Sequence, residues 1–248
     1  MTAADQPRSG AQAVDRAIHV LNCFEGDDPE LSVSELAHRA GLPVSTTYRL
    51  AQALVRGRLL EQDPLTDRYR IGHGLASLAR PALSRLGIDA AAPHLYALAA
   101  GIRITVSLSI ADDHDAVTVF QARPPVYFCP NQLPRARQPL RSSAVGHALL
   151  AYSPSVAVSP TDLDRVRRSG FAVEVIDSED PVRSVAVPIL GPDKQVWGAI
   201  GVQARSARLN DELVRGIVPA MRQIAGRIGP LCQSTAAITD APLELYSR

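Results

Sequence analysis

One short run of residues has the composition of a metal site, Asp112-Asp113-His114-Asp115. Carboxylates and imidazole are ordinary ligands for divalent cations. The run lies between two stretches, Ile104–Ile110 and Ala116–Gln121, that have the composition of β-strands. Aspartates are also typical of the tight turn between two strands. We therefore interpret the run as a solvated hairpin turn and expect no metal site.

Residues that can perform catalysis are present, but not in catalytic patterns. The sequence contains no HExxH, GxSxG or Walker A motif. No cysteine has a neighbouring histidine that could activate it. The three cysteines, Cys23, Cys129 and Cys232, lack the spacing of a zinc site or a disulfide framework. We expect reduced thiols packed as small apolar groups, no cofactor and no enzymatic activity.

A second set of residues has the chemistry of nucleic-acid binding. Small hydroxyl side chains, which can bond phosphates and base edges, begin an expected helix at Ser45, Thr46 and Thr47. Arg49 and Gln52 follow on a nearby face. Leu50, Leu54 and Tyr48 are expected to face the core. The alternative is that Thr46 and Thr47 only cap the helix.

The elements around this helix complete a pattern. An amphipathic helix is expected over Ala13–Phe24. A second helix begins after Ser32, which forms a capping box with Glu35, and ends at Gly41. The third helix is capped by Ser45 or Thr46 and runs to about Arg56.

A hairpin follows the three helices. Its strands are Leu59–Gln62 and Arg68–Ile71, and its turn spans Asp63–Asp67. Arg68 and Arg70 flank the turn, where they suit contacts to phosphates or the minor groove. The alternative is that both arginines only solvate the strand. Three helices and a hairpin predict a winged helix-turn-helix.

The rest of the chain alternates between helix and strand signals, so the fold class is α/β (α+β). We expect a disordered tail over 1–10, the winged domain over 11–73, a linker helix over 74–88 and a second domain over 89–248. Pro81 should kink or restart the linker helix. Further helices are expected at Asp89–Ala100, Ser142–Tyr152, Thr161–Ser169 and Asn210–Ile228. Further strands are expected at Val126–Cys129, Phe171–Ile176, Val182–Leu190 and Val196–Gln203.

Several longer motifs recur in a fixed order along the chain. The first half contains AVDRAIHVLNCF, LSVSELAHRAGLPVSTTYRLAQALVRGRLLEQD and YRIG, and the second contains PLRSSAVGHALLA, GFAVE, VRSVAVPI and VWGAIGV. These motifs resemble those of the IclR family of bacterial transcription regulators. The resemblance implies a recognition helix at Val44–Arg56 and a GAF-like domain that binds a small effector. Val44 stands where many members carry a basic residue.

The resemblance also implies an effector site. The family's positions fall on Tyr127, Ala144, Val145, Glu174, Ser184, Gly201 and Gln203, with Arg141 where the family often has histidine. The Arg141 guanidinium could pair with an effector carboxylate or with Glu174. The implied effector is a small organic acid or an aromatic catabolite. Gly201 and Gln203 replace small hydroxyl residues of some members, which implies a pocket of a different shape.

The overall charge does not announce a nucleic-acid binder, because the net charge is +1. The chain has no apolar run long enough to span a membrane and no signal-peptide pattern, so a cytoplasmic protein is expected. The expected partners are a double-stranded operator, a small-molecule effector, and further copies in a homodimer or a homotetramer. The expected role is that of a repressor.

Two other readings remain open. The chain could be a small-molecule carrier or enzyme whose helical domain no longer binds DNA, since residues 1–80 carry no excess of basic side chains. It could also be a regulator that has no functional pocket and responds only by oligomerisation.

Overall fold

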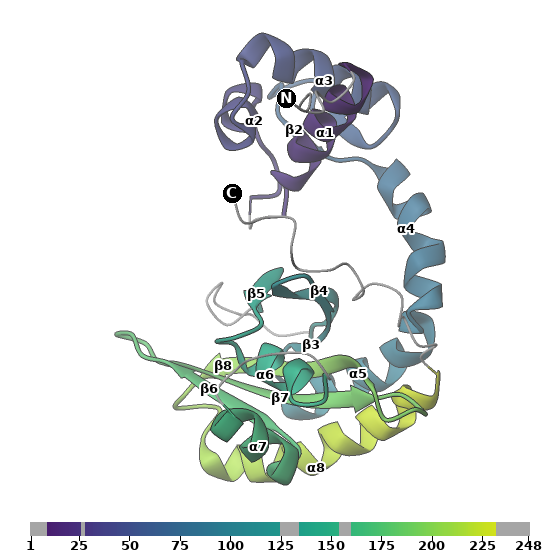
Figure 1. Cartoon of the computed structure of the whole chain (residues 1–248). Helices are drawn as coiled ribbons and strands as arrows, with labels where there is room; N and C mark the ends of the chain where they lie inside the picture. The colour runs from purple at the N-terminus through teal and green to yellow at the C-terminus, as the bar shows by residue number, and fades with distance from the viewer. Residues whose placement is uncertain (1–8, 26–27, 125–133, 154–159, 232–248) are drawn as a thin grey trace, which may run out of the picture. The chain divides into compact units, whose positions relative to one another are not determined.

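The structure is a computed structural model that describes residues 9–25, 28–124, 134–153 and 160–231. The chain divides into two units, Met1–Ala82 and Leu83–Arg248, and this division falls within the segment 74–88. Figure 1 labels the elements of both units. Across the described ranges, no helix is long and apolar enough to cross a lipid bilayer.

Three helices form the body of the first unit: α1 (Ser9–Asn22), α2 (Val33–Ala40) and α3 (Val44–Arg56). The predicted capping box is confirmed, since Ser32 accepts from the Glu35 N–H and the Glu35 side chain accepts from the Ser32 N–H. Gly41 ends α2 in the left-handed region, with φ 64°. The cap predicted for α3 is wrong, because α3 begins one residue earlier and its N-cap is Pro43, which makes no side-chain cap bond.

The predicted hairpin is confirmed as β1 (Leu60–Gln62) and β2 (Tyr69–Ile71), which pair antiparallel. Hereafter, residues 60–71 are called the wing. The Tyr69 backbone also exchanges two hydrogen bonds with Leu31, at 2.7 and 2.9 Å. Both side chains are buried in the core formed by the three helices. The wing is therefore anchored to the helical body at its second strand.

The helix that follows the wing, α4 (His73–Arg85), includes Pro81. The expected restart at Pro81 is therefore wrong, because helix continues on both sides of the proline. The start of α4 lies against the end of α3. The Gly74 N–H donates to the Arg58 carbonyl at 2.9 Å, and a Cβ on Gly74 would lie 2.5 Å from that oxygen. Only glycine permits this approach of two backbones.

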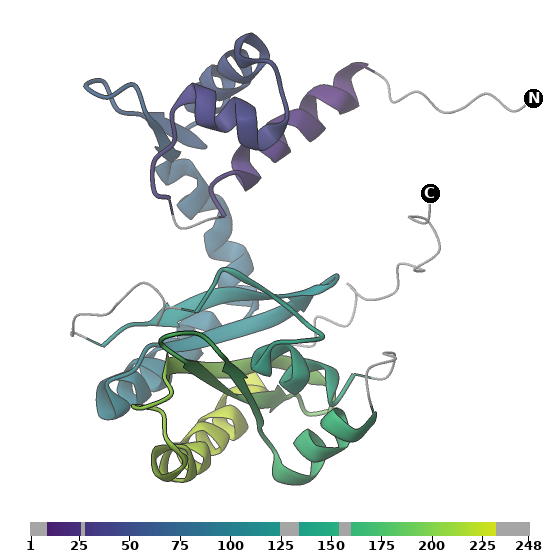
Figure 2. The same cartoon turned by 90° about the vertical axis from the view of Figure 1, so that its left-hand side faces the viewer.

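The second unit is a six-stranded antiparallel sheet in the order β5-β4-β3-β8-β7-β6. Its helices are α5 (Ile88–Ile102), α6 (Ala144–Leu150), α7 (Pro160–Ser169) and α8 (Asp211–Ile228), followed by a 3₁₀ turn at Gly229–Leu231. Helices α5 and α8 share one apolar cluster with the sheet, and α6 and α7 share another. Figure 2 shows these helices on opposite faces of the sheet. The predicted mixed fold is confirmed.

Most strands lie close to their predicted positions. They are β3 (Val106–Asp112), β4 (Asp115–Ala122), β6 (Ala172–Ile176), β7 (Val182–Leu190) and β8 (Val196–Arg205). Asp112 pairs with Asp115, so the predicted hairpin turn is confirmed. The sequence did not predict β5 (Arg137–Pro139), which pairs with β4. The strand predicted at Val126–Cys129 lies outside the described residues.

Candidate nucleic-acid interface and effector site

One side of α3 is open to solvent and polar at its N-terminal end. Ser45 and Arg49 are exposed, and Thr46 is half-buried. These three residues therefore keep the surface position that DNA contact requires. Their predicted roles remain proposals.

The core-facing side of α3 changes two expectations. Thr47, Ala51 and Leu54 are its buried residues, and their i, i+4, i+7 spacing is that of one helix face. Thr47 is 0% exposed and its hydroxyl donates to the Pro43 carbonyl at 3.1 Å. Thr47 is thus removed from the predicted contact surface. Tyr48, expected in the core, is instead 50% exposed.

A groove of about 720 Å³ runs between α1 and α3. Its lining residues are Ala13, Arg16, Thr46, Tyr48, Arg49, Leu50, Gln52, Ala53 and Arg56. Hereafter, Arg16, Arg49 and Arg56 are called the groove arginines. Within the described ranges, none of them forms a hydrogen bond or an ion pair. Sequence reasoning missed Arg16 and Arg56, although Arg49 and Arg56 are spaced as one face of a helix.

Gln52 connects α3 to the wing. Its side-chain nitrogen donates to the Gln62 side-chain oxygen at 2.8 Å and to the Tyr69 hydroxyl at 3.1 Å. Burial raises the pKa of the Tyr69 hydroxyl. Both donor positions of the Gln52 amide therefore already have partners within the domain. In this arrangement Gln52 holds the wing, and reading a base edge would require those bonds to break.

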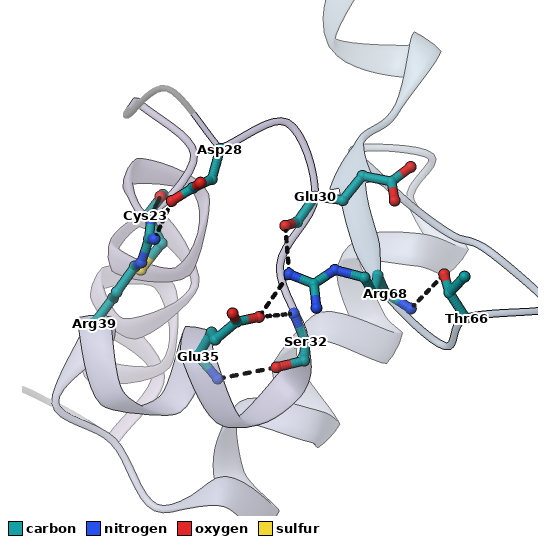
Figure 3. Close-up of polar contacts among 8 residues, drawn as sticks. All are labelled: Cys23, Asp28, Glu30, Ser32, Glu35, Arg39, Thr66 and Arg68. Atoms are coloured by element: carbon teal, nitrogen blue, oxygen red, sulfur yellow. Dashed lines mark hydrogen bonds and ion pairs between the residues drawn. The ribbon is translucent and has the colours of Figure 1, made fainter.

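Arg68, predicted to contact DNA, is turned toward the helical body (Figure 3). Its guanidinium donates to the Glu35 carboxylate at 2.8 Å and to the Glu30 carbonyl at 2.9 Å. Glu35 is also the capping residue of α2, and bonds from Ser32 lower its pKa. Arg68 therefore links the wing to the start of α2.

Arg70 is likewise paired with carboxylates. It lies 3.2 Å from Glu61 and 3.4 Å from Glu30. Glu61 also accepts from the ring and the backbone N–H of His73, the first residue of α4. These bonds, chiefly those from His73 and then that from Arg70, lower the pKa of Glu61 to about 2. The pairs link both strands of the wing to α4.

The tip of the wing is acidic. Asp63 accepts from the N–H groups of Leu65 and Thr66 at 2.8 and 3.0 Å, which lowers its pKa. Asp67 lies at the other end of the turn with φ 56°, and Leu65 between them is 92% exposed. Two carboxylates at the tip disfavour approach to a phosphate backbone. The wing therefore offers less to DNA than its arginines suggested.

A second cleft in this unit contains the one cysteine of the described ranges. It is lined by His19, Asn22, Cys23, Arg39 and Ala40. Arg39 pairs with Asp28 and donates to the Cys23 carbonyl (Figure 3). Burial raises the pKa of the Cys23 thiol, and the thiol donates to the His19 carbonyl at 3.2 Å. A protonated, bonded thiol is a poor nucleophile.

In the second unit, several predicted effector residues come together between α6 and the sheet. Glu174 accepts from the Ala144 N–H at 3.0 Å. Ser184 donates to the Gln203 side-chain oxygen at 3.2 Å. A Cβ on Gly201 would lie 3.0 Å from the Val145 side chain, so α6 packs closely on β8.

Two other predicted effector residues are not joined to this group. Arg141 is exposed, and the expected alternative of an Arg141–Glu174 pair is wrong, because the Glu174 carboxylate accepts from Ala144. Across the described ranges, no arginine or lysine pairs with Glu174. Tyr127 lies outside the described residues.

Searching the described ranges finds no group of three or more histidine, cysteine or acidic side chains able to hold a metal ion. Near the Asp112–Asp115 turn, the carboxylates of Asp112 and Asp115 pair with Arg137 at 2.9 and 3.6 Å. Arg137 thus ties β5 to the hairpin.

Two family models match this chain. One describes the IclR helix-turn-helix domain and matches residues 13–64. The other describes the C-terminal domain of bacterial IclR transcriptional regulators and matches residues 160–229. The two matched segments lie in different units of the structure.

Individual relatives agree with the family models. The HTH-type transcriptional repressor AllR of Escherichia coli strain K12 is 26% identical over 230 residues, which cover 83% of this chain and 84% of AllR. The crystal structure of an IclR family transcriptional regulator from Brucella abortus is 26% identical with a TM-score of 0.64, covering 88% of this chain and 91% of that one. An IclR homologue of Microbacterium hydrocarbonoxydans, crystallised with 4-hydroxybenzoate, is 22% identical with a TM-score of 0.71, covering 88% and 98%.

Proposed function

The chain belongs to the IclR family of DNA-binding transcriptional regulators, and we propose that it is a repressor whose operator binding is controlled by a small effector. The relatives are regulators, which supports a role in binding and not in catalysis. A regulator must reach the chromosome, which supports a cytoplasmic location.

The observation that carries the DNA-binding proposal is the solvent-facing surface of α1 and α3. We propose that Ser45, Thr46 and Arg49 contact bases or phosphates at the N-terminal end of α3. Arg16 and Arg56 contact phosphates on either side. Each groove arginine is free of internal pairs, so phosphate binding breaks no bond within the domain.

The proposal includes a symmetric assembly. Regulators with a helix-turn-helix commonly bind two half-sites, and a two-fold symmetric protein matches a pseudo-palindromic operator. We propose a homodimer or a dimer of dimers. The effector would bind between α6 and the sheet, near Ala144, Glu174, Ser184 and Gln203. A small organic acid or an aromatic catabolite is the proposed class, since a homologue was crystallised with 4-hydroxybenzoate.

Control by an effector requires two states that it binds unequally. Helix α4 continues the chain from the first unit into the second, so it is the proposed carrier of the signal. Its first turn is fixed to Arg58 and Glu61. A change at α4 would therefore act directly on the end of α3.

Fluorescence anisotropy with the DNA upstream of the protein's own gene tests this function. We expect tight binding that prefers this DNA to a scrambled duplex and weakens steeply as salt rises. Failure to bind any duplex at low salt would contradict the proposal and favour a carrier or an enzyme.

A further inference from the structure

Polar side chains form a row across neighbouring strands of the second unit. Glu174 in β6 pairs with Ser184 in β7, and Ser184 pairs with Gln203 in β8. Direct partners in an antiparallel ladder point to the same face of the sheet. Gly201, two residues before Gln203, lies against Val145 of α6. The row therefore lies on the face that α6 covers.

Thr105 extends the row to a fourth strand position. Ile104 and Val106 lie in the apolar cluster shared with α5 and α8, so alternation turns Thr105 to the α6 face. Val106 pairs with Val202 in β8. Continuing this register by one residue brings Thr105 beside Gln203.

The hydrogen bonds in the row leave acceptor capacity unused. The Ser184 hydroxyl donates to Gln203, and one Glu174 oxygen accepts from the Ala144 N–H. Within the described ranges, the second Glu174 oxygen has no hydrogen-bond or ion-pair partner. The Thr105 hydroxyl is buried there without any partner. A buried polar atom without a partner is unfavourable, and a bound ligand is one way to satisfy it.

We propose that Thr105, Glu174, Ser184 and Gln203 form a hydrogen-bonding floor that selects an effector by an amine or hydroxyl group directed at Glu174. An ionised carboxylate only accepts hydrogen bonds. An amine or a hydroxyl donates to it, whereas an effector carboxylate at the same place is repelled. Glu174 is thus the specificity-determining residue, and Thr105 is an additional ligand-binding residue. This inference rests on the proposed effector-binding function.

Calorimetric titration of the full chain with matched compounds tests the selection. The probes are benzylamine, benzyl alcohol and benzoate, and n-butylamine, n-butanol and butyrate. In at least one set the amine or alcohol should bind at least about tenfold more tightly than the acid, one charged hydrogen bond being the difference. Equal or tighter binding of the acid in both sets, or no binding by any amine or alcohol, would overturn the proposal.

Two variants separate ligand selection from structure. Glu174→Gln keeps the acceptor for the Ala144 N–H, so it should fold normally and lose the preference for the amine. Glu179→Gln, in the exposed turn after β6, is its matched control. Thr105→Val should leave the melting temperature of the ligand-free protein unchanged or higher, because a buried unpaired hydroxyl is removed. It should still weaken binding of the preferred probe, and a lower melting temperature with unchanged binding would mean a structural role.

These readouts do not involve DNA. Loss of operator binding with retained selection among the probes would contradict only the regulator function. Operator binding without any selection would contradict only the inference.

Discussion

The groove between α1 and α3 and the wing both carry arginines at the surface of the first unit, but their pairing is opposite. Within the described ranges, Arg16, Arg49 and Arg56 form no hydrogen bond or ion pair. Arg68 and Arg70 each contact carboxylates of the same unit. Equal charge therefore does not mean equal availability to a phosphate.

The difference separates recognition from support. A groove arginine gives up only hydration when it meets a phosphate, and it releases counterions from the DNA. A wing arginine must also leave its internal partners, and the nearby wing tip carries Asp63 and Asp67. We infer that the groove arginines set DNA affinity, while the wing arginines hold the wing against α2 and α4.

Replacing all three groove arginines should give the largest effect. In the variant R16Q/R49Q/R56Q, the slope of log affinity against log salt should become shallower by about 3, since each phosphate contact contributes roughly 0.9. Arg49→Gln alone should weaken binding roughly tenfold or more, as a charged hydrogen bond contributes about 1.5–3 kcal/mol. Anisotropy titrations over a salt series measure both.

Arg227→Gln is the matched control, because Arg227 is exposed on α8 in the other unit. It should change neither affinity nor slope. An unchanged slope in the triple variant would place the phosphate contacts elsewhere and break the comparison.

Replacing Gly74 by alanine tests the support role by stability. The new Cβ would lie 2.5 Å from the Arg58 carbonyl oxygen, so one backbone must move. Overpacking of this kind costs about 1–3 kcal/mol, which a urea titration would detect. Gly216→Ala in α8 is the control, since nothing lies within 4 Å of its added Cβ. There helix propensity should raise stability by about 0.5–1 kcal/mol. Destabilisation of both variants alike would show that the approach to Arg58 is not special.

The sequence predicted the local features of this support and not its long-range pairs. The Ser32–Glu35 box, the hairpin and the Asp112–Asp115 turn are encoded within a few residues, so they were predicted correctly. The partners of Arg68 are 33 and 38 residues away, which no local pattern reveals. Strand β5 has only three residues and gains its order from pairing with β4.

Within α3, a stricter use of periodicity would have corrected two residues. Thr47, Ala51 and Leu54 share one helix face, which identifies Thr47 as buried and leaves Tyr48 outside. At the effector site, the sequence gave the positions only through a family resemblance. That Glu174 accepts from Ala144 instead of pairing with Arg141 depends on how β6 lies beside α6.

Replacing Arg68 by glutamine should have a smaller effect and of a different kind. The change removes the pair with Glu35 and the bond to the Glu30 carbonyl, both near the surface. Exposed pairs stabilise proteins little, so we expect the melting temperature to fall by a few degrees at most. The salt slope of operator binding should stay as in the parent protein. A slope reduced by about 1 would instead identify Arg68 as a phosphate contact.

The smallest effect should be a pH-dependent one at Glu61, where the wing meets α4. The folded state lowers the pKa of this carboxyl from 4.5 to about 2, chiefly through the bonds from His73. A lowered pKa means that the fold favours the ionised form, so the stabilisation is present above about pH 4.5 and is lost as the pH falls toward 2. Glu61→Gln cannot ionise and lacks this contribution at every pH. In urea titrations the parent should therefore be more stable than the variant near neutral pH, and the gap should narrow steadily below about pH 4.5. A gap that stays constant with pH would mean that the charge of Glu61 does not stabilise the wing, and that its contacts with His73 and Arg70 act only as neutral hydrogen bonds.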